Sequence, residues 1–326
     1  MHLLSMLLRR LAQGAVILLL TSFIIFTLLR VVPGDPVRLI VGGMAPDNVV
    51  EEVARKMGLR DPIIVQYGRY LGSLVMGDLG RSYQRPQSGA IAQGGVYNDL
   101  TRGEMAKVSD LIMERLPLTL QLAGLGFVFA LLISLPLGIW GGLNPGRFPD
   151  KLAFFAGSLF VSLPNFWLGI VLALVISVQL QWLPSIGYKD FSFTILPAIV
   201  LAIELSPFII RSLTVSVAQV MREPFIDATT VRGLTYAQAV FGHALRNASV
   251  PLLNLLGIQL STLLGGVLVV EYIFDYPGLG QLTVNAVLQR DFPLIQGIAI
   301  VTSAIFVLIN IMVDVLATMI DPRLDY

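Results

Sequence analysis

The residues that could act on another molecule are gathered in one polar segment, Glu223 to Pro251, which lies between two apolar stretches. Gly233 divides this segment, and glycine readily adopts the left-handed backbone that ends a helix. The pattern predicts a short helix, a glycine turn and a second helical run, with Pro251 starting the next helix. A plain linker is the alternative, but the 29 residues involved are more than a connection requires. The residues expected to give this docking surface its charge are Asp227, Arg232, His243 and Arg246, together with Arg222 immediately before the segment.

The sequence offers little that could carry out covalent chemistry. It contains no cysteine, so thiol nucleophiles and thiolate metal sites are excluded. Its two histidines, His2 and His243, are too far apart in the chain to form a helical zinc-binding pair. A phosphate-binding loop requires Gly-Lys followed by Ser or Thr, and none of the four lysines follows a glycine. We therefore expect a protein that is not an enzyme, with no catalytic or metal-binding residues and no cofactor of its own.

The composition indicates an integral membrane protein. Hydrophobic residues make up 55% of the 326 residues and charged residues 13%, whereas soluble domains carry about 25% charged residues. The formal net charge of +1 gives no reason to expect nucleic-acid binding. We expect an all-α, multi-pass protein embedded in the lipid bilayer.

Six apolar stretches are long enough to cross a bilayer. The first, residues 11–29, would extend about 28 Å as a helix, which matches the hydrocarbon thickness. A cleaved signal peptide is the alternative here, but its apolar part would be shorter and would end in small residues. Prolines inside such spans are tolerated where neighbouring helices satisfy the freed carbonyls. The predicted spans are residues 11–29, 116–142, 152–180, 191–210, 251–270 and 293–318.

The distribution of basic residues predicts the orientation of these spans. With the amino terminus inside, eight basic residues lie in short inner segments and two in short outer loops, which satisfies the positive-inside rule. Both termini and the polar segment are then cytoplasmic, whereas residues 31–115, 181–190 and 271–292 are outside. The inner residues are Arg9, Arg10, Arg147, Lys151, Arg222, Arg232, Arg246 and Arg323, and the outer ones are Lys189 and Arg290.

The long segment 31–115 is predicted to form an extracytoplasmic loop domain after the first span. Asp47 is expected to cap a short helix that ends at Gly58. From Gln84 to Lys107 the composition changes to Gly, Gln, Ser and Asn, which favours a flexible surface excursion. The expected divisions are 1–30 (tail and first span), 31–115 (loop domain), 116–320 (a five-helix core with the cytoplasmic loop 222–250) and 321–326 (cytoplasmic tail).

One acidic residue, Glu204, lies well inside a predicted span. Ionisable groups in the membrane are costly, so each of them is a candidate functional group. A hydrogen bond to a neighbouring helix, or exposure to a water-filled path, is one interpretation, and contact with a substrate ammonium is the other. Asp314, near the inner end of the last span, is expected to cap or pair locally.

Several motifs resemble those of importer permeases of the ABC (ATP-binding cassette) class. Asp227-Ala228-Thr229, three residues and Gly233 resemble the EAA motif, with Asp in place of Glu and Thr in place of the second Ala. The spacing from Gly233 to Pro251 resembles the dipeptide, oligopeptide and nickel branch, and most closely the B-type permease subunit of peptide transporters. The resemblance covers nearly the whole chain except about residues 84–107. Further motifs of that branch are Val32-Pro33-Gly34-Asp35-Pro36, Gly77-Asp78-Leu79-Gly80, Leu163-Pro164-Asn165-Phe166-Trp167 and Tyr276-Pro277-Gly278-Leu279-Gly280.

This resemblance implies a type I importer permease with six helices in a bacterial plasma (inner) membrane, forming half of a pathway for di- or oligopeptides. The implied partners are a second homologous permease subunit, two ATPase subunits that bind ATP and magnesium, and an extracytoplasmic substrate-binding protein. The polar segment would be the coupling loop, in which Phe225, Ile226 and Ala228 present an apolar face to an ATPase. The implied coupling residues are Phe225, Ile226, Asp227, Ala228, Thr229, Arg232, Gly233, Leu234, His243 and Arg246, and the candidate pathway residues are Gln121, Ser162, Asn165, Glu204 and Asn254.

Three alternatives stay open at this point. The same machinery would import nickel, glutathione or another small solute if its binding protein selected that cargo. A self-sufficient secondary transporter would have inverted repeats, broken helices and several embedded ionisable groups, whereas the sequence has one such acid and no evident repeat. A membrane-embedded hydrolase would need a metal or nucleophile constellation, and the sequence offers none.

Overall fold

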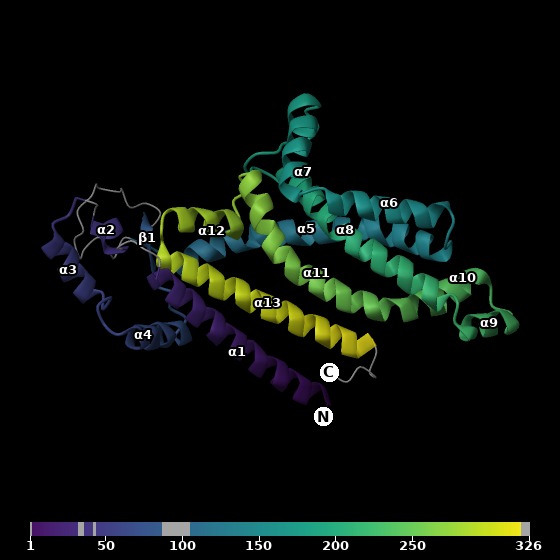
Figure 1. Ribbon diagram of the computed structural model, residues 1–326, viewed down its shortest axis with the longest axis horizontal. Coiled ribbons are helices and arrows are strands. Elements are labelled where there is room, and N and C mark those ends of the chain that lie inside the picture. The colour runs from purple at the N-terminus through teal and green to yellow at the C-terminus, as the bar shows by residue number, and fades with distance from the viewer. Residues whose placement is uncertain (1, 32–35, 42–43, 87–104, 321–326) are drawn as a thin grey trace. The chain divides into compact units, whose positions relative to one another are not determined.

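The computed structural model describes residues 2–31, 36–41, 44–86 and 105–320, most of them in helices (Figure 1). The chain divides into two compact units. The first unit comprises Met1–Leu8, Leu118–Pro277 and Phe306–Tyr326, and the second unit comprises Arg9–Pro117 and Gly278–Ile305. Three long helices contribute residues to both units, namely α1 (His2–Val31), α5 (Val108–Leu143) and α13 (Phe292–Ile320).

Each of the six apolar stretches predicted from the sequence falls on helices. In the described residues, four helices are long and apolar enough to cross a membrane, or up to six spans exist if each of two bent helix pairs is one span. The four helices are Met6–Val31, Val108–Leu143, Ser192–Val220 and Phe292–Leu316. The bent pairs are Phe148–Ser162 with Asn165–Gln179, and Pro251–Leu263 with Gly265–Ile273.

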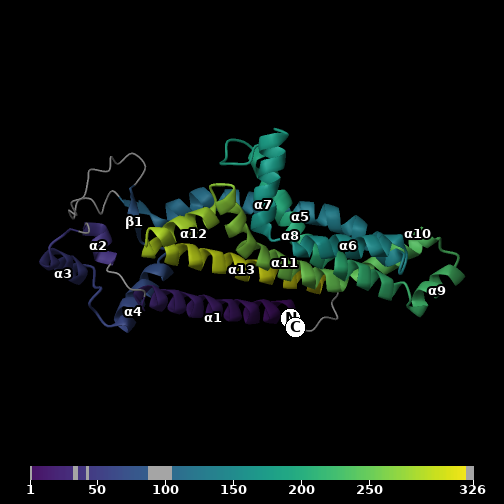
Figure 2. The ribbon, with the colours of Figure 1, turned by 45° about the horizontal axis from the view of Figure 1, so that its top comes forward.

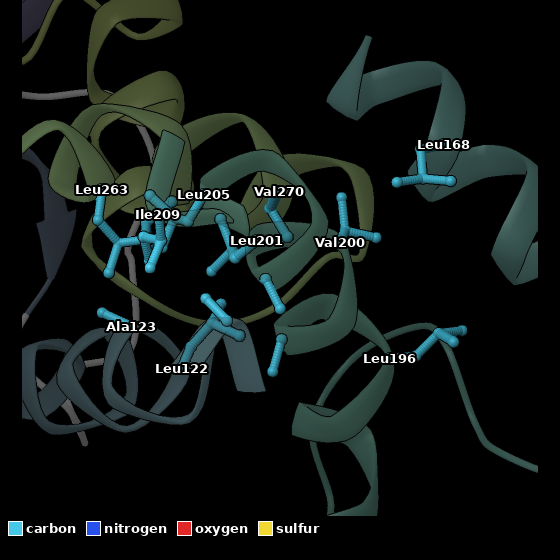
Figure 3. Packing of buried hydrophobic residues seen from close by; sticks show 14 of the residues in the cluster. Leu122, Ala123, Leu168, Leu196, Val200, Leu201, Leu205, Ile209, Leu263 and Val270 are labelled. Atoms are coloured by element: carbon cyan, nitrogen blue, oxygen red, sulfur yellow. The ribbon is translucent and has the colours of Figure 1, made fainter. Parts of the chain in front are cut away.

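Helix α8 (Ser192–Val220) forms the centre of the first unit. Buried side chains lie along its whole length, as expected for a helix surrounded by other helices. It packs against α6 (Phe148–Ser162) and α11 (Leu245–Ile273). Figure 3 shows Leu201 and Leu205 of this helix gathered with Leu122 of α5 and Leu263 of α11, all members of one apolar cluster.

Glycines on α5 allow this helix to approach α8 closely. A Cβ atom at Gly126 would lie 2.9 Å from the Cβ atom of Leu201, and one at Gly138 would lie 2.6 Å from the Cβ atom of Leu213. Real Cβ atoms do not come that close, so larger residues would push the helices apart. Small residues of this kind are typical of helix contacts within membranes.

The predicted span 152–180 is a bent pair of helices. Helix α6 ends at Ser162, and α7 (Asn165–Leu172) continues into the π-helix η2 (Ala173–Gln179) at 94° to it. Pro164 explains the break, because the residue before a proline is driven out of the helical conformation, and Leu163 has extended backbone angles. Figures 1 and 2 show α7 turned away from α6. The predicted stretch therefore consists of two helices rather than one.

Pro251 does not start a helix, contrary to the prediction. It lies inside α11, which begins at Leu245 and ends at Ile273. Prolines are tolerated within apolar helices where neighbours satisfy the freed carbonyl. The bend of 44° in this helix comes later, between Leu263 and Gly265.

The second unit contains most of the segment 31–115. It includes α2 (Pro36–Val41), α3 (Asp47–Lys56), α4 (Ile63–Val75) and α12 (Leu279–Leu288). Gly58 has φ +67° and follows the end of α3, as predicted. Asp47 does not cap that helix; Pro46 holds the capping position, and the Asp47 carboxylate instead pairs with Arg38.

The second unit also contains a two-stranded antiparallel sheet that the sequence did not predict. Strand β1 (Arg81–Pro86) pairs with β2 (Met105–Lys107), with Arg81 opposite Lys107 and an irregular register beyond it. Residues 87–104, the greater part of the expected surface excursion, lie outside the described residues, as does the tail 321–326. The fully buried carboxylate of Asp291 accepts hydrogen bonds from the Ser82 hydroxyl and from the backbone N–H of Tyr83 (3.0 Å), which fixes β1 beside α13.

Candidate functional site

The polar segment folds as a short helix, a glycine turn and a second helix, as predicted. Helix α9 (Pro224–Val231) ends at a turn in which Gly233 has φ +81°. The backbone N–H of Leu234 donates to the carbonyl of Thr229 at 3.1 Å. This bond closes the Schellman motif, which ends helices at a left-handed glycine.

A capping box starts the second helix immediately after the turn. The Thr235 hydroxyl accepts from the backbone N–H of Gln238, and the Gln238 side chain accepts from the backbone N–H of Thr235 at 2.9 Å. The chain continues without a break through α10 (Tyr236–Ala239) and the π-helix η3 (Val240–Ala244) into α11. The segment is therefore an ordered projection, and Figures 1 and 2 show it beyond the end of α8.

The exposed face of α9 differs from the predicted one at one position. Phe225 is 38% exposed and Ala228 is exposed, but Ile226 is only 7% exposed. Thr229, one turn later, is also buried, and its hydroxyl donates to the carbonyl of Ile226 at 2.7 Å. Residues three apart share a face of a helix, so Ile226 and Thr229 form the inner face. Ile226 therefore does not join Phe225 on the surface.

Most of the other predicted coupling residues lie on the surface of the projection. Leu234 is half-buried beside the turn. The exposed members are Asp227, Arg232, Gly233, His243 and Arg246.

Three exposed apolar side chains of the projection were missed from the sequence. Val231 is 88% exposed, Tyr236 is 63% exposed and Phe241 is 72% exposed. Exposed aromatic residues are enriched at protein interfaces, particularly in their centres. The sequence feature that could have revealed them is the presence of two aromatic residues in a stretch predicted to face water.

Two predicted pathway residues meet where α7, α8 and α11 come together. The Nδ2 atom of Asn165 donates to Oε2 of Glu204 at 3.0 Å, and the Glu204 side chain is half-buried. On the other side, a Cβ atom at Gly266 would lie 2.9 Å from the same carboxylate oxygen. The carboxylate therefore occupies space that exists because position 266 has no side chain.

A third predicted residue, Gln121, belongs to a separate polar chain. Its Nε2 atom donates to the Thr194 hydroxyl at 3.0 Å, which lies 3.2 Å from the Tyr276 hydroxyl. Burial raises the pKa of Tyr276 to about 12, so this phenol stays protonated at neutral pH. The Tyr188 ring packs edge-on against that of Tyr276, with 5.3 Å between the ring centroids.

The remaining pathway candidates lie elsewhere on their helices. Ser162 is exposed at the end of α6, and its hydroxyl donates to the carbonyl of Ser158 at 2.7 Å, a contact within one helix. Asn254 is exposed on α11. The structure therefore unites Asn165 with Glu204 but does not place Ser162 or Asn254 in that contact.

A second acid inside a long helix was missed. Glu271 is fully buried near the end of α11, and the Thr119 hydroxyl donates to its Oε1 atom at 2.7 Å. The sequence placed the end of the span at residue 270, whereas α11 continues to Ile273. Glu204 remains the acid predicted well inside a span, and Glu271, near the end of α11, joins it as a candidate functional group.

The sequence matches two families that together extend over most of the chain. Residues 134–326 match the family described as binding-protein-dependent transport system inner membrane component. Residues 3–123 match the amino-terminal region described for membrane components of such systems. The chain belongs to this family. The resemblance to importer permeases of the ABC class is thereby confirmed.

Relatives of this membrane component match it from end to end. A putative peptide transport system permease protein of Brucella suis is 34% identical over 330 residues, covering 99% of both chains. The oligopeptide transport system permease protein AppB of Bacillus subtilis is 32% identical and covers 98% of both. The glutathione transport system permease protein GsiC of Escherichia coli K12 is 34% identical and covers 95% of both.

A solved structure shares the fold of this membrane component over its larger part. The MetNI methionine ABC transporter, in a native crystal form, contains a chain that aligns with a TM-score of 0.55 and 20% identity. The alignment covers 65% of this chain and 97% of that chain. This likeness shows that the aligned part of the present chain has the same fold as that chain. The rest of the present chain has no counterpart in the alignment.

Proposed function

We propose that this chain is the permease subunit of an ATP-driven importer of di- or oligopeptides and forms half of its translocation pathway. The proposal rests on the end-to-end match to relatives that are named peptide and oligopeptide permeases. A second homologous permease subunit would supply the other half. A substrate-binding protein outside the membrane would deliver the cargo.

The projection around Gly233 is the proposed site at which the ATPase subunits couple ATP hydrolysis to transport. Two ATPase subunits would bind ATP and magnesium, and one of them would receive α9 and the following helix. Phe225, Tyr236 and Phe241 supply exposed apolar surface, and Asp227 and Arg232 flank it with charge. Because capping contacts fix both ends of the turn, a push on the projection is transmitted into α8 and α11.

We propose that the polar contact between Asn165 and Glu204 lines the translocation pathway in this chain. Glu204 carries a carboxylate that could attract the ammonium group of a peptide as it passes. Gln121, Ser162 and Asn254 are further candidates. The same contact would also serve to hold α7 against α8.

The proposed topology has six spans, counting each bent pair as one, in a bacterial inner membrane. Both termini and the projection would be cytoplasmic. Residues 31–115 would form the extracytoplasmic loop domain, with 1–30 and 116–320 as the membrane-embedded parts and 321–326 as the tail. A cysteine introduced at Val231, which is 88% exposed, should react with a membrane-impermeant maleimide only after cells are opened.

The decisive experiment compares two glycines of similar conformation. Gly233 and Gly77 have φ +81° and +78°, and neither has another atom close to where a Cβ would lie. Gly233→Val should abolish both co-purification of the ATPase subunits and peptide uptake, whereas Gly77→Val should retain both while imposing comparable backbone strain. Retained coupling in Gly233→Val, with normal membrane insertion, would refute the role of the projection.

Glutathione is the alternative cargo that a specific observation favours. The match to GsiC has the same identity as the match to the Brucella permease, although it covers slightly less of each chain. Competition for uptake by proteoliposomes would decide, because glutathione and a linear tripeptide differ in the linkage of the first residue. Inhibition by glutathione alone would replace the peptide assignment and leave the importer role intact.

A further inference from the structure

The second unit contains a cavity of about 470 Å³ that none of the coupling or pathway candidates lines. Its walls come from α1, α2, α3, α4, strand β1, the start of α13 and the residues between α3 and α4. Leu29, Ile63 and Phe292 contribute apolar surface, and Arg30 and Gln296 contribute polar groups. Sites for small molecules typically have this size and combine apolar walls with a few polar groups.

Arg30 brings a positive charge to this cavity. Its Nε atom donates to Oε1 of Gln66 at 2.8 Å, and one Nη atom donates to the carbonyl of Phe26 at 3.2 Å. The guanidinium carbon lies 3.4 Å from the centroid of the Phe26 ring. These contacts fix the plane of the guanidinium, and they use only two of its five N–H groups.

No carboxylate of the described residues pairs with Arg30. The other charged residues of the wall, Arg60 and Asp61, each have a partner of opposite charge. Arg60 lies 2.6 Å from a carboxylate oxygen of Glu51, and Asp61 lies 2.6 Å from a guanidinium nitrogen of Arg69. The cavity therefore retains one uncompensated positive charge.

Gln296 provides an independent sign that the cavity accommodates a ligand. Its side chain is only 7% exposed and lines the cavity. Its amide makes no hydrogen bond to another residue within the described part of the chain. The amide atoms are accessible from the cavity rather than sealed in the interior, so a polar group inside the cavity would give them a partner.

We propose that this cavity binds a small carboxylate that carries a short apolar group. The fixed guanidinium of Arg30 presents its remaining N–H groups to the carboxylate, which is the geometry that arginine uses for bidentate binding. The amide of Gln296 donates to the same ligand, and the apolar wall holds its side group. One uncompensated charge matches a monoanion, which favours a carboxylate over a doubly charged phosphate.

The test compares two molecules of the same shape, one of which has a carboxylate where the other has an uncharged amide. N-acetyl-leucine and its uncharged amide, N-acetyl-leucinamide, are titrated calorimetrically into the full-length chain in a neutral detergent. The acid should bind saturably and the amide about tenfold more weakly, a difference typical of a lost charged hydrogen bond. Equal affinity for the two molecules, or no saturable binding of the acid, would overturn the proposal.

Three variants assign the binding to this cavity. Arg30→Gln should remove the preference for the acid, whereas Arg55→Gln removes an exposed arginine on α3 that does not line the cavity and should leave it unchanged. Gln296→Met keeps the side-chain volume and the charge of Arg30, and it should weaken acid binding several-fold even if Arg30→Gln fails to fold. Unchanged binding by Gln296→Met would contradict the site.

Phospholipid is the other source of an anion near Arg30. The titration is therefore repeated in nanodiscs that contain phosphatidylglycerol. Binding of the acid with unchanged affinity supports a soluble carboxylate. Its loss in these nanodiscs alone would assign Arg30 to a lipid phosphate and overturn the proposal.

Discussion

Asn165 donates a hydrogen bond of 3.0 Å to Oε2 of Glu204, so that the helix after the 94° bend is joined to the central helix by a polar contact. The two residues come from α7 and α8, and Gly266 of α11 leaves the space that the carboxylate occupies. Three helices thus meet at one acid. A change in this contact would alter how α7 is held against α8.

Replacement of Gly266 by alanine should disturb this contact without unfolding the chain. The new Cβ atom would lie 2.9 Å from Oε2 of Glu204, and the end of a flexible side chain can move away. Loss of the bond to Asn165, worth about 1 kcal/mol, should reduce peptide uptake roughly fivefold. Uptake is measured in proteoliposomes that contain the complete importer.

The neighbouring Gly265 is a matched control for this substitution. It lies on the same helix, and a Cβ atom there would meet nothing within 4 Å. Gly265→Ala brings the same gain in helix propensity, about 1 kcal/mol, but should leave uptake unchanged. Equal uptake by the two variants would show that the Asn165–Glu204 contact has no part in transport.

The exposed aromatic residues of the projection should contribute to binding of an ATPase subunit. Tyr236→Ser and Phe241→Ser remove apolar surface from side chains that are 63% and 72% exposed, so the stability of the chain itself should change by less than about 0.5 kcal/mol. Truncation of an aromatic anchor at an interface costs about 2 kcal/mol or more. The double variant should therefore lose most of the ATPase in a pull-down with a tagged chain.

A third exposed aromatic residue controls for general effects of lost apolar surface. Trp182 is 73% exposed in the connection between η2 and α8. Trp182→Ser should retain the ATPase. If the Tyr236 and Phe241 variants also retain it, the projection binds through its charged residues or not at all.

The local pattern of the sequence was sufficient to predict the helices and the turn of the projection, but not to predict which of its side chains are exposed. Glycine at position 233 has φ +81°, and the predicted helix, turn and helix followed from that residue type. Which side chains of α9 face inward depends on the helix that it packs against. Ile226 was therefore assigned to the wrong face, and Tyr236 and Phe241 were not recognised.

The bend in the third apolar stretch illustrates a similar limit. Pro164 interrupts the helix, whereas Pro197, Pro207 and Pro251 lie inside helices that continue. All four prolines lack an N–H group, so the local chemistry is the same. The difference lies in the tertiary surroundings of each carbonyl, which one sequence does not reveal. The pairing of Asn165 with Glu204 was unpredictable for the same reason, because it depends on how two helices cross.

The hydrogen bond from Thr119 to Glu271 should contribute to the stability of the first unit. Glu271 is fully buried, so removal of a donor leaves its carboxylate less well satisfied. Thr119→Val keeps the shape but removes the hydroxyl, and it should lower the free energy of unfolding by about 1–3 kcal/mol. Thr119→Ser retains the donor and should lose much less. Thermal unfolding in detergent measures both, and a larger loss for Thr119→Ser than for Thr119→Val would mean that packing of the methyl group, rather than the hydrogen bond, matters at this position.

The close approach of α5 and α8 gives the sharpest prediction for stability. A Cβ atom at Gly138 would lie 2.6 Å from the Cβ atom of Leu213 and 3.2 Å from the carbonyl oxygen of Ile210. Neither atom is the end of a flexible side chain, so the helices must separate. Gly138→Ala should therefore destabilise the chain by about 1–3 kcal/mol through overpacking, despite the better helix propensity of alanine. Gly124→Ala, on the same helix with no atom within 4 Å, should be neutral or stabilising in the same thermal unfolding experiment. The opposite order would show that α5 and α8 are not in the described contact in the membrane.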